Sequence, residues 1–453
     1  MAKKWLHGVH LPHQKSTADQ PPVQMPVPSL VTIPMAMHIG VPAQPVVKAK
    51  DPVAVGQLIG EAVGPVSSPV YSGVSGTVKK IDLYRQSNGS TCSSVVIETD
   101  GLQTLWEGLT PPEITDFDSF IAAVRASGVV GLGGAGFPTA VKLKVDPEKV
   151  AWICINGAEC EPYITSDTRT MLDQTDRIRA GILLLQRFYP KARVVIGVEK
   201  NKPQCIEKLN LALKDLTGVE VQTLPALYPQ GGEKVLIYHT TGRIVPEGKL
   251  PIDVGCIVMN PTTLASVVHY VQTGMPLVEK CVTVDGGAVK EPKNVMVPIG
   301  TSVADLLSFA GGFKTEPAKI IMGGPMMGLA LPDDRQVIVK NTNAILAFSE
   351  SEAVLPEPTA CIRCGRCIDA CPLNLMPVEF EQAYHQRDGA RLKKLKVNLC
   401  MECGCCAFVC PAKRRLVETH KLAKGVLAAY HQKQKEAEAK KAASAQRKGG
   451  EDA

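Results

Sequence analysis

Apolar residues between positions 28 and 100 come in short, valine-rich runs that Gly, Pro and Ser interrupt every few residues. Runs of this length, bounded by turn-forming residues, are typical of strands and turns. The segment therefore predicts a small all-β module without helices. The residues before it, 1–27, are polar and rich in proline, which indicates an arm more than a domain.

The pattern changes between residues 112 and 275, where helix-like and strand-like stretches alternate. Residues 151–156 and 193–198 are short apolar runs of the kind that form buried strands. Residues 115–126 have helical character, as does the long stretch 166–188 between the two strands. This alternation predicts an α/β layout.

Further along the chain, residues 276–335 return to a β pattern that includes one helix-like segment, 302–312. Cysteines concentrate between residues 350 and 425, and the polar stretch 426–453 is helix-prone or disordered. At 453 residues the chain is long enough for three or four domains. Together the patterns predict a multidomain protein of α/β and α+β class.

The amino-acid composition and the distribution of charge argue against some classes of function. With 45% apolar and 21% charged residues, the chain has the balance of a soluble globular protein. The net charge of +6 arises from Lys413 onward, where eleven Lys and Arg face five acidic residues. Because the rest is nearly neutral, a nucleic-acid-binding domain is not expected. A secretory signal is not expected, because no apolar stretch follows Lys3 and Lys4, and no apolar run reaches eighteen residues.

Eight of the fifteen cysteines form two copies of one motif, 39 residues apart. Each copy reads Cys-x-x-Cys-x-x-Cys-x-x-x-Cys-Pro, the spacing of bacterial ferredoxins. Three closely spaced thiolates hold one [4Fe–4S] cluster, and the fourth cysteine ligates the other cluster. The expected ligands are Cys361, Cys364, Cys367 and Cys410 for cluster 1, and Cys371, Cys400, Cys403 and Cys406 for cluster 2.

Zinc is the alternative metal, because soft thiolates also bind it. Zinc sites use paired Cys-x-x-Cys knuckles, however, and need neither the third cysteine nor the final Cys-Pro. Two iron–sulfur clusters are therefore the preferred interpretation, and metal-binding cysteines indicate a reducing cytoplasm. Cys405, inside the second motif, has no assigned role.

A dense run of glycines lies between residues 128 and 144. Gly131, Gly133 and Gly136 have the spacing of a dinucleotide fingerprint, which requires a strand directly before it. The preceding residues, 120–128, have a helical pattern, so an ordinary Rossmann site is not expected. Backbone N–H groups of the loop could approach a phosphate, with Lys142 as counter-charge. A tight turn without a ligand is the other interpretation.

Residues 133–142 resemble the glycine loop of the flavoprotein subunit of respiratory complex I, which binds FMN and NADH. Three further segments match that family in the same order: 156–162, 231–233 and 260–264. The resemblance implies that FMN and NAD(H) are cofactors here. The implied cofactor-binding residues are Gly131, Gly133, Gly134, Gly136, Phe137, Lys142, Asn156, Glu159, Glu161, Gly232, Glu233, Asn260 and Thr263.

Within that set, the resemblance places Lys142, Glu159 and Glu161 on the nicotinamide side, as catalytic residues. Three positions depart from the family pattern. Leu132 replaces an arginine, Ala158 an aspartate and Met259 an asparagine. Contacts to the flavin ribityl chain and to NADH would differ at these positions.

The order of modules extends the resemblance. Residues 28–100 resemble the barrel-sandwich fold of lipoyl carriers, although no lysine lies between Lys50 and Lys79 to carry a group. Residues 276–335 resemble the SLBB-type β-grasp module. With the two-cluster domain at 350–425, the order resembles the RnfC family of the Rnf complex, the ion-translocating ferredoxin:NAD oxidoreductase. That family implies partnership with membrane subunits and a ferredoxin-type subunit, and a peripheral place on the cytoplasmic face of the inner membrane.

Two alternatives use the same parts. The cobalamin reductase of diol-using microcompartments combines flavin, β-grasp and two-cluster modules, but its barrel-like module comes last. Here that module comes first. The second alternative is a non-catalytic iron–sulfur relay whose flavin domain has lost its ligand, an interpretation that the departures at Leu132 and Ala158 motivate.

Overall fold

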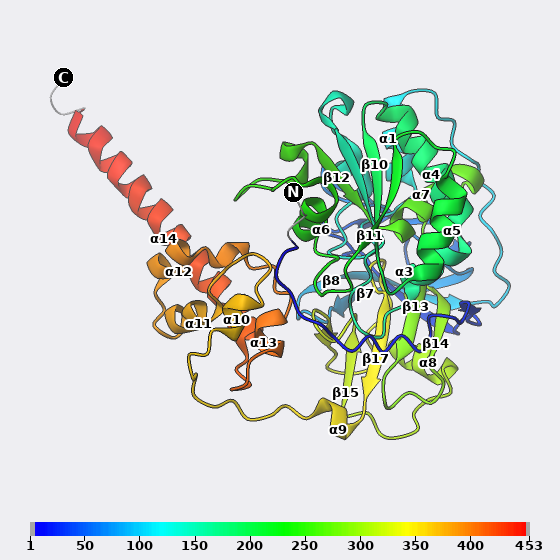
Figure 1. Ribbon diagram of the computed structural model, residues 1–453. Helices are drawn as coiled ribbons and strands as arrows, with labels where there is room; N and C mark the ends of the chain where they lie inside the picture. Colours follow the sequence, from blue (N-terminus) through cyan, green and yellow to red (C-terminus); the bar gives the residue numbers. More distant parts are fainter. Residues whose placement is uncertain (1–4, 450–453) are drawn as a thin grey trace. The chain divides into compact units, whose positions relative to one another are not determined.

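The computed structural model describes residues 5–449, with side chains up to residue 440 (Figure 1). The chain forms two compact units. The larger unit contains Pro12–Ala226 and Gln230–Val354. The smaller unit contains the chain up to Leu11, the short segment Leu227–Pro229 and the chain from Leu355 onward.

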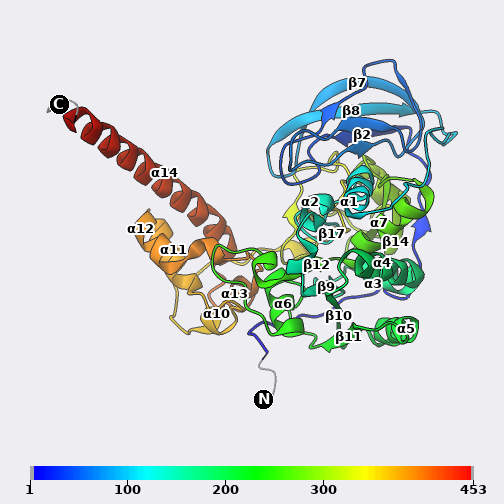
Figure 2. The same cartoon turned by 90° about the horizontal axis from the view of Figure 1, so that it is seen from above.

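The first module of the larger unit consists of two small sheets whose strands all pair antiparallel, with no helix between residues 28 and 100 (Figure 2). Val31, Ile33, Val95 and Ile97 are buried and contribute to its core. One sheet has the order β2 (Leu30–Pro34), β8 (Thr91–Thr99), β7 (Gly76–Arg85) and β4 (Pro52–Val53); the other has the order β3 (Gln44–Pro45), β5 (Leu58–Glu61) and β6 (Val70–Tyr71).

The second module is a four-stranded parallel sheet with helices on both faces. The two predicted strands are present as its central pair. Because side chains alternate along a strand, Ile153 and Ile155 pack with α4 and α7 on one face, whereas Cys154 packs with α6 on the other. The strand order is β11 (Val219–Leu224), β10 (Arg193–Glu199), β9 (Trp152–Asn156) and β12 (Cys256–Met259); the helices are α1 (Phe117–Ala126), α2 (Thr139–Leu143), α3 (Ser166–Asp173), α4 (Thr175–Phe188), α5 (Pro203–Leu213), α6 (Glu233–Thr241) and α7 (Pro261–Thr273).

The single helix expected over 166–188 is interrupted at Gln174. This residue leaves the helical region, with φ −123° and ψ 32°. The Thr175 hydroxyl donates to the Met171 carbonyl at 2.7 Å, a local bond that competes with the helical backbone pattern. The result is two helices, α3 and α4. The first turn of α3 contributes Asp167 and Thr168 to the contacts of the candidate site.

The third module is a six-stranded mixed sheet with the short helix α8 (Val303–Phe309). Two of its strands come from outside residues 276–335. β1 belongs to the proline-rich arm, which is therefore tied into a sheet, and β17 follows the range. A two-residue strand is too short to leave a sequence pattern, and β17 is buried on both faces and so lacks alternation. The order is β1 (Val23–Gln24), β14 (Lys293–Pro298), β13 (Glu279–Asp285), β17 (Ala344–Phe348), β15 (Lys319–Met322) and β16 (Leu329–Ala330).

The smaller unit is helical. Phe380, Leu392, Val397 and Leu427 form its apolar core. The basic stretch that was expected to be helical or disordered continues a helix, α14, as far as Gly449. The helices are α10 (Arg366–Asp369), α11 (Pro377–His385), α12 (Gly389–Leu395), α13 (Cys405–Phe408) and α14 (Leu416–Gly449). Across residues 5–449, no helix combines the length and the apolar character of a membrane span.

Candidate functional site

The residues of the predicted flavin site meet at the carboxyl edge of the parallel sheet. β9 ends at Asn156 and its neighbour β12 ends just before Asn260. Since parallel strands point the same way, both asparagines emerge at one edge, which is where α/β sheets bind ligands. Asn156 Nδ2 donates to the Gly231 carbonyl at 2.8 Å, which brings the 231–233 segment to the same edge.

The glycine loop, residues 128–137, follows helix α1 and lies against the first turn of α7. The Leu132 amide donates to Thr263 Oγ1 at 2.9 Å. A Cβ at Gly133 would overlap the Asn260 side chain, whereas a Cβ at Gly134 would meet nothing within 4 Å. Gly136 has φ +71°, a backbone region that favours glycine. The loop therefore combines close backbone approach at one glycine with open space at the next.

Asn260 caps helix α7, and its side chain is fully engaged. Its oxygen accepts from the Thr262 and Thr263 amides at 2.8 and 3.1 Å, and its Nδ2 donates to Asp167 at 2.6 Å. Thr262 Oγ1 donates to the other Asp167 oxygen at 2.6 Å. Asp167 is thus a member of the site that the sequence analysis missed, because its contacts are to α7, more than ninety residues further along the chain.

Lys142 joins three elements. Its Nζ lies 3.1 Å from Glu233 Oε1 and 3.1 Å from the Val258 carbonyl. Glu233 is the first residue of α6, and Gly232 caps that helix. Both side chains are partly exposed, 31% for Lys142 and 43% for Glu233. The pair therefore remains accessible to a ligand.

Glu159 and Glu161 lie on the loop after β9, residues 157–165, which we call the acidic loop. The Glu159 carboxylate accepts from the amides of Asp167 and Thr168 at 2.8 and 3.2 Å, and from Thr168 Oγ1 at 2.7 Å. It is only 7% exposed and caps α3. Burial raises the pKa of Glu159 above its ordinary value. Its contacts in this structure shape the acidic loop, and its contact with nicotinamide stays a prediction.

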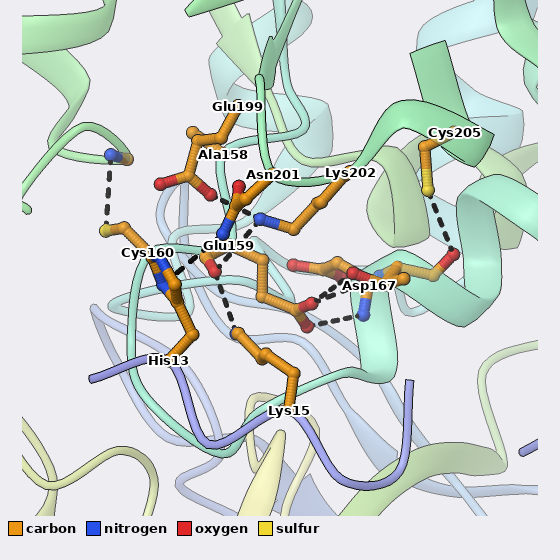
Figure 3. A network of polar contacts seen from close by, with 12 residues as sticks. His13, Lys15, Ala158, Glu159, Cys160, Asp167, Glu199, Asn201, Lys202 and Cys205 are labelled. Atoms are coloured by element: carbon orange, nitrogen blue, oxygen red, sulfur yellow. Dashed lines mark hydrogen bonds and ion pairs between the residues drawn. The ribbon is translucent and has the colours of Figure 1, made fainter. Parts of the chain in front are cut away.

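Beneath the acidic loop lies a network of buried charges (Figure 3). Lys15, from the N-terminal arm, donates to the carbonyls of Glu159 at 2.9 Å and Glu161 at 2.8 Å, and also to that of Ile164. Lys202 pairs with Glu199 and reaches the same Glu159 carbonyl at 3.3 Å. Burial lowers the pKa of Lys15 from its ordinary value. The proline-rich arm, including Lys15, is thus part of the site, which the pattern alone did not reveal.

Two buried polar atoms on the segments around the site have no hydrogen-bond partner among the described residues. They are Thr139 Oγ1, directly after the glycine loop, and Gln230 Nε2, directly before the 231–233 segment. Buried polar atoms are rarely left unsatisfied unless a ligand or water completes them. With the open space at Gly134, they fit a bound flavin, whose carbonyl and hydroxyl groups can form hydrogen bonds. The sequence analysis did not single out either residue.

The cysteines of the smaller unit gather around two separate cavities. Each cavity contains one of the crossed sets expected from the sequence. Among the residues lining the first are Cys361, Cys364, Cys367 and Cys410; among those lining the second are Cys371, Cys400, Cys403 and Cys406. Cys405 lies at the second cavity too, and its Sγ is 3.8 Å from the Tyr228 carbonyl oxygen. Each cavity is thus lined by the four thiols expected for one four-iron cluster, and their ligation of a cluster stays a prediction.

Comparison with protein families agrees with these geometries. The family model of the Nuo51 FMN-binding domain matches residues 124–269, that of the SLBB domain 281–330 and that of the 4Fe–4S dicluster domain 360–413. The chain is therefore a flavin- and iron–sulfur-binding electron-transfer protein. A fourth model, the RnfC barrel sandwich hybrid domain, matches residues 3–102.

Three curated relatives, each the subunit designated C of its complex, identify the family. The one from the proton-translocating ferredoxin:NAD(+) oxidoreductase complex of Clostridium ljungdahlii is 42% identical over 83% of both chains. Its counterpart from the Na(+)-translocating complex of Acetobacterium woodii is 40% identical over 94% of this chain and 97% of its own. The relative from the ion-translocating oxidoreductase complex of Rhodobacter capsulatus is 36% identical over 93% and 82%. This chain belongs to that family, the RnfC proteins.

The predictions of family, fold class and cofactors are thereby confirmed. The barrel-sandwich match at the N-terminal end also favours this family over the cobalamin reductases, in which that module comes last. A solved structure of an NAD+-reducing [NiFe]-hydrogenase in the H2-reduced state has a TM-score of 0.49 at 18% identity, over 68% of this chain and 63% of its own, which is too low to assign a function. The individual residue roles stay predictions.

Proposed function

We propose that this chain is the NAD(H)-reacting, electron-transferring subunit of a membrane-bound, ion-translocating ferredoxin:NAD+ oxidoreductase. The observation that carries the proposal is the combination of parts in one chain. A flavin-type α/β domain has Asn156, Asn260 and the 231–233 segment at one sheet edge, and the smaller unit has two cavities lined by four cysteines of the repeated motif each. The names of the relatives supply the reaction and the complex.

The chemistry explains why both kinds of cofactor occur together. A hydride carries two electrons, an iron–sulfur cluster accepts one, and a flavin can exchange either number. The role of the residues of this chain is to bind and orient the cofactors and the dinucleotide. Gly134 leaves open space beside the backbone for a ligand, Gly133 lets the Asn260 side chain approach the loop, and Asn156, Asn260 and Thr263 hold the loops of the sheet edge together.

On the nicotinamide side, Lys142, its partner Glu233 and Glu161 are charged groups that remain partly exposed. Lys142 is held between Glu233 and the end of β12, so its ammonium has a fixed place. Glu161 presents a half-buried carboxylate. A cation and an anion in fixed positions can orient a dinucleotide without taking part in bond breaking.

The proposal extends to partners and location. Electrons pass between this protein and membrane subunits of the complex together with a ferredoxin-type subunit. The chain is peripheral on the cytoplasmic face of the inner membrane. Support comes from the multi-subunit complexes to which the relatives belong.

Anaerobic purification followed by NADH titration tests the proposal. We expect about eight iron and eight sulfide per chain, FMN, bleaching of the flavin band at about 450 nm, and then EPR signals of reduced clusters. Iron and sulfide at this level without flavin or any response to NADH would contradict the proposal. That result would support the non-catalytic relay.

A further inference from the structure

The two cysteine motifs of the smaller unit have the same backbone conformation but different side chains between the cysteines. Arg363 in the first copy and Glu402 in the second occupy the same position and have φ +53° and +59°. Gly365 and Gly404, two residues further on, have φ +79° and +88°. Because matched positions share one backbone conformation, each copy serves as a structural control for the other.

In the second copy, the smaller unit itself engages the side chains at two of these positions. Glu402 pairs with Lys424 of α14, which also donates to the Cys400 carbonyl at 2.8 Å. Cys405 is buried, and its Sγ lies 3.8 Å from the Tyr228 carbonyl oxygen. Neither side chain is therefore available to a partner protein.

In the first copy, the same two positions carry arginines. Arg363 corresponds to Glu402, and Arg366 corresponds to Cys405. Both arginines are exposed, and within residues 5–440 neither side chain takes part in an ion pair or a hydrogen bond. A guanidinium carries five N–H donors and a permanent positive charge, so this copy presents unused donors where the other copy is closed.

A third matched position adds another charge. Lys413 and Asn374 are the third residues after the last cysteine of each copy, and they have φ +52° and +53°. Lys413 is exposed, and its two neighbours in sequence, Ala412 and Arg414, line the first cavity. The matched positions thus give three unpaired positive charges at the first cavity, against one negative charge at the second that an ion pair already neutralises.

Exposed apolar side chains lie among these charges. Ile362 is 67% exposed and Met376 is 43% exposed, and both line the first cavity together with Arg363. Apolar residues, methionine and arginine side by side are typical of protein–protein interfaces. The second cavity is lined instead by buried residues such as Phe380 and His420. We call the surface formed by Ile362, Arg363, Arg366, Met376 and Lys413 the first-cavity face.

We propose that the first-cavity face docks a one-electron carrier protein with an acidic surface, and that electrons enter or leave this chain there. The inference deepens the proposed function and rests on it, because it takes the cysteine cavities as cluster sites. Each encounter moves one electron, so the carrier is oxidised by one electron and this protein is reduced by one, or the reverse. Unpaired positive charge attracts an acidic protein and speeds association. It also attracts an anionic membrane, but a lipid surface neither supplies nor accepts electrons.

Binding of an acidic bacterial ferredoxin to the oxidised holoprotein tests the proposal, with affinity measured by calorimetry at several salt concentrations. Arg363→Glu gives the first copy the residue that the second copy has at this position. We expect Arg363→Glu and Arg366→Glu each to weaken binding about tenfold at low salt and to reduce its salt dependence. In stopped flow, the second-order rate constant for oxidation of pre-reduced ferredoxin should fall by about the same factor. Iron content should not change.

Lys433→Glu is the matched control. It makes the same change of charge at an exposed residue of α14 that lines neither cavity, and it should leave affinity within about twofold of the wild type. A basic cytochrome c, the control probe, should not bind. Arg363→Gln combined with Arg366→Gln removes both charges without reversing them. This variant should weaken ferredoxin binding even if the reversed charges prevent cluster incorporation.

Other results would overturn the inference in distinguishable ways. A wild-type protein that does not bind the ferredoxin at low salt, or arginine variants that bind it normally, would exclude this face as its docking site. Equal losses in Lys433→Glu and Arg363→Glu would mean that net charge alone attracts the carrier. If only binding to phosphatidylglycerol vesicles is lost in the arginine variants, the occupant is a membrane surface. None of these results affects the proposed function, which a holoprotein without flavin or response to NADH would contradict.

Discussion

The flavin site and the cluster sites are built in opposite ways. The eight cluster cysteines all come from residues 361–410 of the smaller unit. The flavin site uses residues 131–263 of the larger unit, and distant lysines reach its loops. Lys15 binds the acidic loop, Lys280 donates to the Leu132 carbonyl at 3.0 Å, and Lys340 donates to the Gly128 carbonyl at 2.7 Å.

These three lysines have a common physical role. Lys280 and Lys340 are buried and Lys15 is half-buried, and each donates to the main chain of a loop that no regular hydrogen-bond ladder supports. A buried ammonium is costly unless oxygen atoms surround it, and a buried carbonyl is costly without a donor. In the larger unit, the loops of the flavin site are therefore held by lysines that are distant in sequence. In the cysteine domain, all the expected ligands come from one short stretch of the chain.

The largest expected effect is the loss of one cluster. Cys371→Ala should lower iron content by about half, and the cluster that remains should be the one held by Cys361, Cys364 and Cys367, since Cys371 lies at the cavity of the other set. Iron and sulfide analysis with EPR of the reduced protein measures this. Cys405→Ala, the control, should retain all the iron. Loss of the first cluster in Cys371→Ala would show that the sets are not crossed.

The next largest effect concerns Lys142. Lys142→Met should reduce the rate of flavin reduction by NADH, expressed as kcat/KM, by ten- to a hundredfold, or about 1.4 to 2.7 kcal/mol of transition-state stabilisation. Clusters should stay intact. Lys144→Met, two residues on and exposed, is the control. Equal kcat/KM values in the two variants would show that Lys142 does not take part in the reaction with NADH.

The two kinds of site were unequally predictable from the sequence. The cluster motif is local, so spacing alone predicts both ligand sets, and the structure has the cysteines of each set at one cavity. In the flavin site, the motif residues Asn156, Asn260 and Thr263 could be found by resemblance, and the structure brings them together.

What the sequence could not give are contacts between distant segments. Nothing in the arm marks Lys15 as a lysine that binds a distant loop, because its neighbours are polar and proline-rich. The two carboxylates of the acidic loop look equivalent in sequence, yet Glu159 caps α3 while Glu161 binds the 323–328 loop. Their different environments depend on which helix and which hairpin lie beside each, and no local pattern records that.

Lys15 offers a sharper test of the contrast between distant and local assembly. Lys15→Met removes the donor from the Glu161 and Ile164 carbonyls and leaves the Glu159 carbonyl to Lys202 alone, which should destabilise the larger unit by about 3 kcal/mol. Urea unfolding measures this loss. Lys48→Met, at an exposed lysine of the same unit, should have little effect. Iron content should not change, because the cysteine cavities belong to the smaller unit. A lower iron content in Lys15→Met would show that the cysteine cavities also depend on this distant lysine, against the local assembly inferred for them.

The smallest expected effect is a pH dependence that comes from Lys340. Its Nζ donates to Ser68 Oγ at 3.2 Å and to the carbonyls of Pro69 and Gly128 at 2.6 and 2.7 Å, and burial lowers its pKa from 10.5 to about 7. Above pH 7 the folded protein releases a proton that the unfolded chain keeps until about pH 10.5. The free energy of unfolding should therefore rise with pH in this window, by at most about 1.4 kcal/mol per pH unit.

Lys340→Met should remove that rise, so its unfolding free energy should depend less on pH than that of the wild type. Urea unfolding at several pH values between about 7 and 9 measures the slope, and Lys314→Met, at an exposed lysine of the β-grasp module, is the control. The same slope in Lys340→Met and wild type would mean that Lys340 stays charged. Its three oxygen acceptors would then outweigh burial, and the lysine would bind the glycine loop as a permanent cation.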